Sequence, residues 1–210
     1  MALHWPDFQQ ETALLLEGFS SIVGVDEVGR GPLAGPVTAA AVILNPQNLP
    51  LGVADSKALT VKQRDAAFES IIQSAQAISI SFVTAAEIDH INIRQASLLA
   101  MKRAISSLSL KPTFALIDGR DRPELDCPTR AIIKGDATVL SIAAASIVAK
   151  IARDGMMRRL ALLYPDYGFE TNVGYGAKRH LEALERLGPT PFHRFSFAPL
   201  RERDATRRQS

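Results

Sequence analysis

Residues 22–35 read IVGVDEVGRGPLAG, an apolar strand that runs into two adjacent acids and then into a turn with three glycines. The acids are Asp26 and Glu27. An ionised carboxylate in apolar surroundings is costly unless a cation, a metal ion or hydrogen bonds compensate its charge. This stretch therefore predicts a buried strand and a partner for the charge at its end.

Outward from this strand, the chain alternates between segments typical of strands and segments typical of helices. Strands are expected over residues 21–28, 36–44, 77–83, 113–117 and 129–133. Helices are expected over residues 8–17, 60–76, 85–89, 93–108, 139–164 and 177–187. The first two strands are joined by the glycine turn, which predicts an antiparallel pair. The interleaved pattern predicts an α/β domain built on a mixed five-stranded sheet.

The composition indicates one large domain of an intracellular protein. The chain has 210 residues, 47% of them hydrophobic, and a single cysteine, which excludes a disulfide framework and a cysteine-rich zinc site. The N-terminus lacks a basic region followed by an apolar one, so no secretory signal is expected. The longest apolar stretch, residues 139–152, contains Lys150 and is too short to span a bilayer. We therefore expect a cytoplasmic protein without a membrane span.

Charge is distributed unevenly along the chain. Residues 1–149 carry 12 basic and 15 acidic side chains, a net charge of −3, whereas residues 150–210 carry 12 and 7, a net charge of +5. An acidic site beside a basic surface suits a protein that binds a polyanion around bound cations. The asymmetry alone is weak evidence, because many other proteins have a similar one.

Four acids occur where a strand ends or a helix begins, next to glycine: Asp26, Glu27, Asp118 and Asp136. Ligands of open α/β sheets bind where the strands end, so these three segments are expected to bring the four carboxylates together. Oxygen ligands without histidine or cysteine select Mg²⁺ or Mn²⁺. Two such ions about 3.5–4 Å apart support phosphodiester hydrolysis, so the pattern predicts metal-dependent phosphoryl chemistry.

Two of these acids also have a simpler interpretation. Asp118-Gly119 fits a turn, and Asp136 fits the cap of the long helix that follows it. Asp26 and Glu27 are harder to explain in this way, because neither residue favours a strand. Neighbouring strand residues point to opposite faces, however, so these two acids need a bend in the chain to reach one metal ion.

The glycine turn at residues 29–31 does not match either common nucleotide-binding template. No Gly-Lys-Ser/Thr follows it, and its spacing differs from that of the dinucleotide fingerprint. Glycines do expose backbone groups at close range, which suits contact with a sugar-phosphate; a plain tight turn is the alternative. Lys57, in a loop, is either a solvated charge or a phosphate contact.

Several further residues in the basic C-terminal part of the chain have two interpretations. Tyr175 lies between two glycines, where it either stacks on a sugar or base or packs in the core. Lys150 and Arg153, on the long helix, are by default solvated. His193-Arg194 either anchors the tail or contacts phosphate.

Taken together, these motifs closely resemble the ribonuclease HII family, the bacterial type 2 ribonucleases H. The resemblance extends from about residue 22 to residue 200. It is carried by residues 24–35 (GVDEVGRGPLAG), 55–57 (DSK), 116–119 (LIDG), 134–136 (KGD), 144–150 (AASIVAK), 153–154 (RD), 174–175 (GY), 193–194 (HR) and 196–197 (SF). One departure is Val173, where many relatives have lysine.

The resemblance implies a ribonuclease H-like fold and cleavage of RNA in RNA–DNA hybrids, including single ribonucleotides in duplex DNA. The cut would fall 5′ of the ribonucleotide and leave 3′-hydroxyl and 5′-phosphate ends. The acids matching Asp26, Glu27, Asp118 and Asp136 would hold Mn²⁺ or Mg²⁺. The turn formed by Gly29, Arg30 and Gly31 would read the ribose 2′-hydroxyl, Tyr175 would contact the neighbouring sugar, and Lys57 would hold phosphate.

By the same resemblance, we expect a monomer. The pattern of predicted elements divides its chain into three parts. These are an N-terminal extension over residues 1–20, a catalytic domain over residues 21–165 and a helical substrate-binding region over residues 166–210, with a frayed tail after Pro199. Three rival functions remain. They are a metal-free glycosidase that uses paired carboxylates, a nucleic-acid-binding module without activity, and a different nuclease on the same fold, such as a resolvase.

Overall fold

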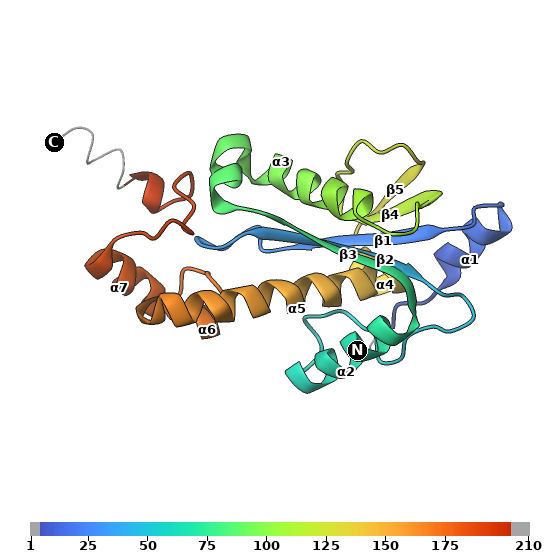
Figure 1. The fold of residues 1–210 in the computed structure, drawn as a ribbon, viewed down its shortest axis with the longest axis horizontal. Helices are drawn as coiled ribbons and strands as arrows, with labels where there is room; N and C mark the ends of the chain where they lie inside the picture. Colours follow the sequence, from blue (N-terminus) through green and yellow to red (C-terminus); the bar gives the residue numbers. More distant parts are fainter. Residues whose placement is uncertain (1–4, 203–210) are drawn as a thin grey trace.

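The computed structural model describes residues 5–202. The tail predicted to fray after Pro199 lies partly outside this range, and the prediction is wrong for its described part, because residues 200–202 are helical and Leu200 is 3% exposed. Five strands form one sheet in the order β3-β2-β1-β4-β5 (Figure 1). Their bounds are Ile22–Val28 (β1), Val37–Leu44 (β2), Ala75–Val83 (β3), Phe114–Asp118 (β4) and Thr129–Ile132 (β5). The pairs β1–β2 and β2–β3 are antiparallel, while β1–β4 and β4–β5 are parallel. The predicted mixed sheet is therefore confirmed.

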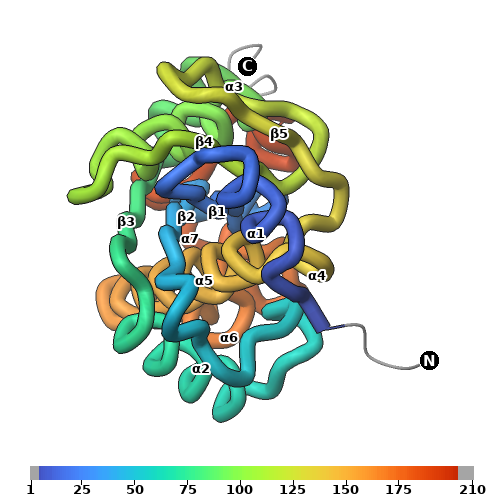
Figure 2. Tube along the Cα trace, turned by 90° about the vertical axis from the view of Figure 1, so that its right-hand side faces the viewer, coloured from blue at the N-terminus to red at the C-terminus, as the bar shows by residue number. Residues whose placement is uncertain are grey.

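Helices cover both faces of the sheet. Figure 2 looks along the sheet from one end and shows α3 (Ala85–Ser106) over one face and α5 (Leu140–Leu163), with α2 (Val61–Ser74) beyond it, over the other. Strand β1 alternates between these layers. Val23 and Val25 pack in the apolar cluster on the α3 side, whereas Gly24 lies against the backbone of α5. The sheet is thus buried on both faces, as expected for its parallel half.

Helix boundaries follow capping residues. Thr60 caps α2 as predicted, with Gln63 completing a capping box. The two helices predicted between residues 85 and 108 form one element, α3, with a kink at Asn92, whose φ is 66°. The Asn92 side chain accepts hydrogen bonds from the backbone N–H groups of Arg94 and Gln95, so it caps the second half of α3.

The start of the long helix differs from the prediction. A separate short helix, α4 (Gly135–Thr138), precedes α5, and Asp136 lies in the first turn of α4. The interpretation of Asp136 as the cap of the long helix is therefore wrong. Instead, Glu11 of α1 (Gln9–Leu16) reaches the start of α5 and accepts a hydrogen bond of 2.8 Å from the Ser141 N–H. Because Glu11 and Leu14 are buried, α1 packs firmly on the body of the protein.

The C-terminal region contains the 3₁₀ helix η1 (Pro165–Tyr167) and the helices α6 (Phe169–Asn172) and α7 (Lys178–Leu187). It lies at the C-terminal end of α5 (Figure 1), and its own apolar cluster includes Phe169, Leu184 and Met157 of α5. Within residues 5–202, no helix is long and apolar enough to cross a membrane.

Two histidines are buried inside this C-terminal region. His180 Nδ1 lies 2.8 Å from the Tyr175 carbonyl oxygen, so it donates a hydrogen bond there. His180 Nε2 lies 2.9 Å from His193 Nε2, and His193 Nδ1 accepts from the Thr190 N–H at 2.9 Å. The network is satisfied when each ring carries one proton. A second proton on either ring would place two N–H donors against each other.

We expect this pair to destabilise the protein in acid. Burial and the neighbouring His180 lower the pKa of His193 to about 4, and burial lowers that of His180. The unfolded chain therefore binds protons first as the pH falls below 6.5, and this costs about 3 kcal/mol by pH 4. Chemical denaturation at pH 7 and at pH 4 gives the free energy of unfolding at each pH. For His193→Gln, this free energy should fall less between pH 7 and pH 4 than it does for the original chain. The control, His90→Gln on the surface, should show the full fall; an equal fall in both variants would contradict the prediction.

Candidate active site

Two of the predicted acids lie on neighbouring parallel strands. Val25 of β1 pairs with Ile117 of β4, so Asp26 and Asp118 follow at the same level of the sheet. Asp26 is 5% exposed and accepts a hydrogen bond from the Glu27 N–H. Asp118 Oδ1 accepts one of 2.7 Å from the Gly135 N–H. This last bond holds the loop before α4 against the end of β4.

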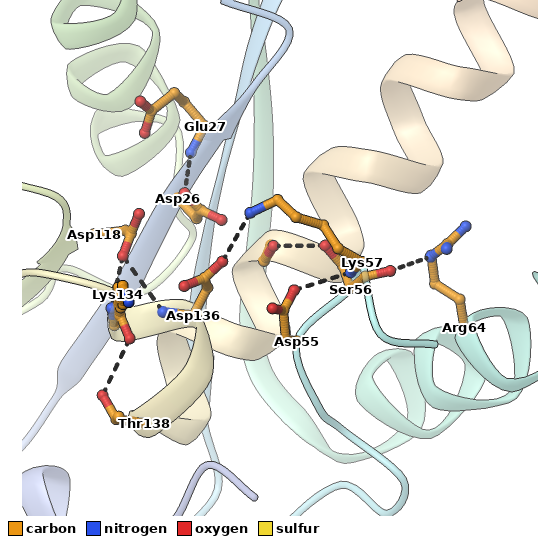
Figure 3. A network of polar contacts seen from close by, with 12 residues as sticks. Asp26, Glu27, Asp55, Ser56, Lys57, Arg64, Asp118, Lys134, Asp136 and Thr138 are labelled. Atoms are coloured by element: carbon orange, nitrogen blue, oxygen red, sulfur yellow. Dashed lines mark hydrogen bonds and ion pairs between the residues drawn. The ribbon is translucent and has the colours of Figure 1, made fainter. Parts of the chain in front are cut away.

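Asp136 completes the group on this side of the sheet. Figure 3 shows Asp26, Asp118 and Asp136 lying together, with the loop of residues 55–57 beside them. Lys57 Nζ lies 3.2 Å from Asp136 Oδ2, and the lysine side chain is 79% exposed. The sheet register and the short helix α4 thus bring together three acids that are far apart in the sequence.

Glu27 lies on the other face, as strand geometry requires. Its carboxylate points away from Asp26 (Figure 3) and pairs with Arg30 at 3.1 Å through Oε1. Its other oxygen, Oε2, is buried without a hydrogen-bond partner. Glu27 and Asp118 both line a pocket of about 390 Å³ between β1, β4 and α3. The two faces of the sheet therefore meet at this pocket.

The site holds more negative charge than its surroundings compensate. Burial raises the pKa of Asp26 well above its usual range, and the charges of Glu27 and Asp118 raise it further. Burial also raises the pKa of Glu27, against the influence of Arg30, and the pKa of Asp118, where Asp136 adds to the effect. A cation placed among these carboxylates would relieve both the burial cost and the repulsion.

The donor set fits a hard divalent cation, but the side chains are not yet arranged as ligands. In residues 5–202, no group of three or more His, Cys, Asp or Glu side chains is close enough to hold an ion as it stands. Arg30 forms an ion pair with Glu27, and Lys57 forms one with Asp136. The oxygen-only chemistry and the free Glu27 Oε2 fit Mg²⁺ or Mn²⁺.

A serine that the sequence analysis missed supports Asp26. Ser146 of α5 is buried, its hydroxyl lies 3.0 Å from the Ser56 hydroxyl, and it lowers the pKa of Asp26 against the effect of burial. The residue after Ser56 is Lys57, so one loop supports both Asp26 and Asp136. The available signal was a hydroxyl within the apolar run of residues 142–149.

The glycine turn lies beside Tyr175. Gly29 has a φ of +91°, and a Cβ placed on Gly31 would lie 3.5 Å from the Tyr175 ring. The Leu33 N–H donates a hydrogen bond of 2.8 Å to the Gly174 carbonyl, which joins the two segments. Tyr175 is 48% exposed, so its interpretation as a core residue is wrong.

The prediction that Arg153 is solvated is also wrong. Its side chain is 1% exposed because α5 passes directly behind the turn, where its guanidinium donates to the carbonyls of Pro36 and Ala34. Lys150, one turn earlier, pairs with Asp154 at 2.9 Å. Val173 ends α6 with a φ of 43° and packs against the apolar cluster of the C-terminal region.

Known proteins share this sequence over most of its length. The family model described as Ribonuclease HII matches residues 23–200. The chain is 56% identical to a protein named Ribonuclease HII from Cereibacter sphaeroides, over 95% of this chain and 94% of that protein. It is 52% identical to one of the same name from Brucella anthropi, over 94% and 91%.

A solved structure agrees with these sequence comparisons. The crystal structure of ribonuclease H2 from Pyrococcus horikoshii OT3 superimposes with a TM-score of 0.77 at 27% identity, over 91% of this chain and all of that one. The predicted ribonuclease H-like fold and the resemblance drawn from the motifs are both confirmed. The chain therefore belongs to the ribonuclease HII family, and its activity is that of a metal-dependent endoribonuclease.

Proposed function

We propose that this enzyme hydrolyses RNA in RNA–DNA hybrids and cuts 5′ of a single ribonucleotide in duplex DNA, leaving 3′-hydroxyl and 5′-phosphate ends. One observation carries the proposal: the buried Asp26 and the half-buried Glu27 and Asp118, at the ends of β1 and β4, lie next to a glycine turn packed against an exposed tyrosine. The first feature suits phosphodiester hydrolysis and the second suits recognition of a sugar.

The acids Asp26, Glu27, Asp118 and Asp136 are the proposed ligands of Mn²⁺ or Mg²⁺. When bound, such ions activate a water and stabilise the leaving oxygen of a phosphodiester. The protein contributes the placement of the four carboxylates, two from β1, one from the end of β4 and one from α4. Lys57 is exposed and lies next to Asp136, so it is placed to hold a phosphate oxygen when it leaves that carboxylate.

The sugar is recognised by the turn and the tyrosine. The 2′-hydroxyl both donates and accepts a hydrogen bond, and it is the group that distinguishes RNA from DNA. Backbone groups of Gly29, Arg30 and Gly31 reach it because the two glycines carry no side chains that would block the approach. The exposed ring of Tyr175 lies beside Gly31, where it contacts the neighbouring sugar.

The helical region over residues 166–210 holds the phosphates of the duplex. Its basic side chains on α7, Lys178, Arg179 and Arg186, are 57–90% exposed. Each forms an ion pair with an exposed carboxylate, and Arg179 also donates a hydrogen bond to the Pro165 carbonyl. Surface pairs of this kind contribute about 0–1 kcal/mol, so phosphates can replace the carboxylates at little cost. The proposal also includes the division into an extension over residues 1–20 and a catalytic domain over residues 21–165, and a monomer that acts in the cytoplasm.

Cleavage of labelled duplexes tests this function. We expect a duplex with one ribonucleotide to be cut on its 5′ side with Mn²⁺ or Mg²⁺, and not with EDTA; an all-DNA duplex should stay intact. Uncut hybrid with bound protein would favour a binding module, and cleavage of four-way junctions alone would favour a resolvase. Hydrolysis of a glycosidic bond at a rate that EDTA does not change would favour a glycosidase.

A further inference from the structure

Two buried arginines lie behind the glycine turn. Arg194, which follows α7, is 0% exposed, and Arg153 of α5 is 1% exposed. Arg194 Nη2 lies 2.5 Å from the Gly29 carbonyl oxygen and 2.9 Å from that of Gly35, and its Nη1 lies 2.8 Å from that of Arg30. A single guanidinium thus binds carbonyls of the turn and the carbonyl of Gly35, just before β2.

These guanidiniums are compensated by the turn itself. Among residues 5–202, neither Arg153 nor Arg194 forms an ion pair with a carboxylate. Arg153 donates to the carbonyls of Ala34 and Pro36, so the two arginines together bind five carbonyls between residues 29 and 36. A buried cation without an ion pair is costly, and an apolar side chain would fill the same space without that cost.

The direction of the carbonyls fixes the direction of the N–H groups. In a trans peptide, the C=O and N–H of one peptide unit point in opposite directions. Arg194 holds the carbonyls of Gly29 and Arg30 on its own side. The N–H groups of Arg30 and Gly31 belong to the same two peptide units, so they point away from Arg194. The backbone donors of the turn therefore depend on a residue that is more than 160 positions away in the sequence.

The same arginine also connects the turn to Tyr175. The Arg194 backbone N–H donates to the Leu33 carbonyl at 2.8 Å, and the Leu33 N–H donates to the Gly174 carbonyl, also at 2.8 Å. Arg194 is thus tied to both segments that form the surface beside the acids.

We propose that Arg194 is a positioning residue that sets the preference of this enzyme for a ribonucleotide over a deoxyribonucleotide, by holding the peptide units at residues 29–31. It does not touch the substrate. The inference rests on the proposed function, because it requires that the turn reads the 2′-hydroxyl.

The test compares the affinities of two duplexes for variants that bind nucleic acid but do not cleave it. In an Asp26→Asn background, we would measure Kd by fluorescence anisotropy for a duplex with one ribonucleotide and for the same duplex in all-DNA form. Arg194→Lys should lower the preference for the ribonucleotide about tenfold and leave the all-DNA Kd unchanged, since one ammonium cannot replace a planar fork. Arg153→Lys, which does not touch the carbonyls of Gly29 and Arg30, should change the ratio less.

The controls separate this role from a general role in folding. Arg103→Lys, on the surface of α3, should leave the ratio unchanged. Thermal melting checks that every variant is folded at the temperature of measurement. If Arg194→Lys does not fold, Arg194→Gln serves instead, since its amide keeps a donor and removes the charge. A folded Arg194 variant with the full preference would overturn the inference. No preference in the Asp26→Asn chain that keeps Arg194 would instead count against the proposed function.

Discussion

Asp26→Asn should reduce cleavage of a duplex with one ribonucleotide by about a thousandfold or more, because a metal ion stabilises the reacting charges by several kcal/mol and Asp26 is one of its proposed ligands. Asp26 is 5% exposed, and burial together with the charges of Glu27 and Asp118 raises its pKa. The amide has nearly the same shape, so affinity for the duplex should stay within about threefold. The measurement is the single-turnover cleavage rate together with Kd.

The same substitution should stabilise the protein when no metal ion is present. The pKa of Asp26 is raised in the folded state, so its contribution to stability is fully present below pH 3.8 and is lost as the pH rises through the folded pKa. At pH 7 in EDTA, Asp26→Asn should therefore melt at a higher temperature than the original chain. Asp65→Asn, an exposed acid on α2, is the control. Full activity of Asp26→Asn, or a lower melting temperature, would contradict this assignment.

Gly24→Ala should destabilise the fold strongly. Gly24 lies in β1 where α5 crosses the sheet, and a Cβ there would lie 2.2 Å from the Ser141 carbonyl carbon and 2.4 Å from the Ile142 nitrogen. Both atoms belong to the backbone of α5, so no change of rotamer can relieve the contact. Forcing α5 away from the sheet should cost about 3 kcal/mol or more, which lowers the melting temperature by about 6–12 °C.

Gly155→Ala is the matched control within α5 itself. A Cβ on Gly155 would meet only Arg158 Nη2, at 3.9 Å, and the backbone there is helical. We expect this variant to gain about 1 kcal/mol, because alanine favours a helix more than glycine does. Equal melting temperatures for the Gly24 and Gly155 variants would show that α5 does not lie as closely on β1 as described.

The strands and most helices were predictable because their signals are local. The apolar run of residues 22–25 and the Thr60 capping box depend on neighbours in the sequence. The cap of α5 was not predictable, since it comes from Glu11, 130 residues earlier. The burial of Arg153 was missed for the same reason. Its partners are the backbone carbonyls of Ala34 and Pro36. Every residue has a backbone carbonyl, so residue types do not reveal such a contact.

The candidate site was predictable in its residue types but not in its arrangement. The acids stood out because Asp26 and Glu27 are unusual in a strand. Strand geometry also predicted that they point to opposite faces, and they do. The ion pairs of Lys57 and Arg30 with two of the acids, and the place of Ser146 beside Asp26, were not predictable. These contacts depend on how α5 and the loop of residues 55–57 pack against the sheet.

The most direct test is anomalous scattering from Mn²⁺ in crystals of this chain with a duplex that carries one ribonucleotide. We expect a peak bounded by carboxylate oxygens of Asp26, Glu27, Asp118 and Asp136, with Lys57 moved away from Asp136. A Mn²⁺ peak elsewhere, or acids that keep their present partners while the crystals cleave the duplex, would contradict the assignment of these residues as the metal site.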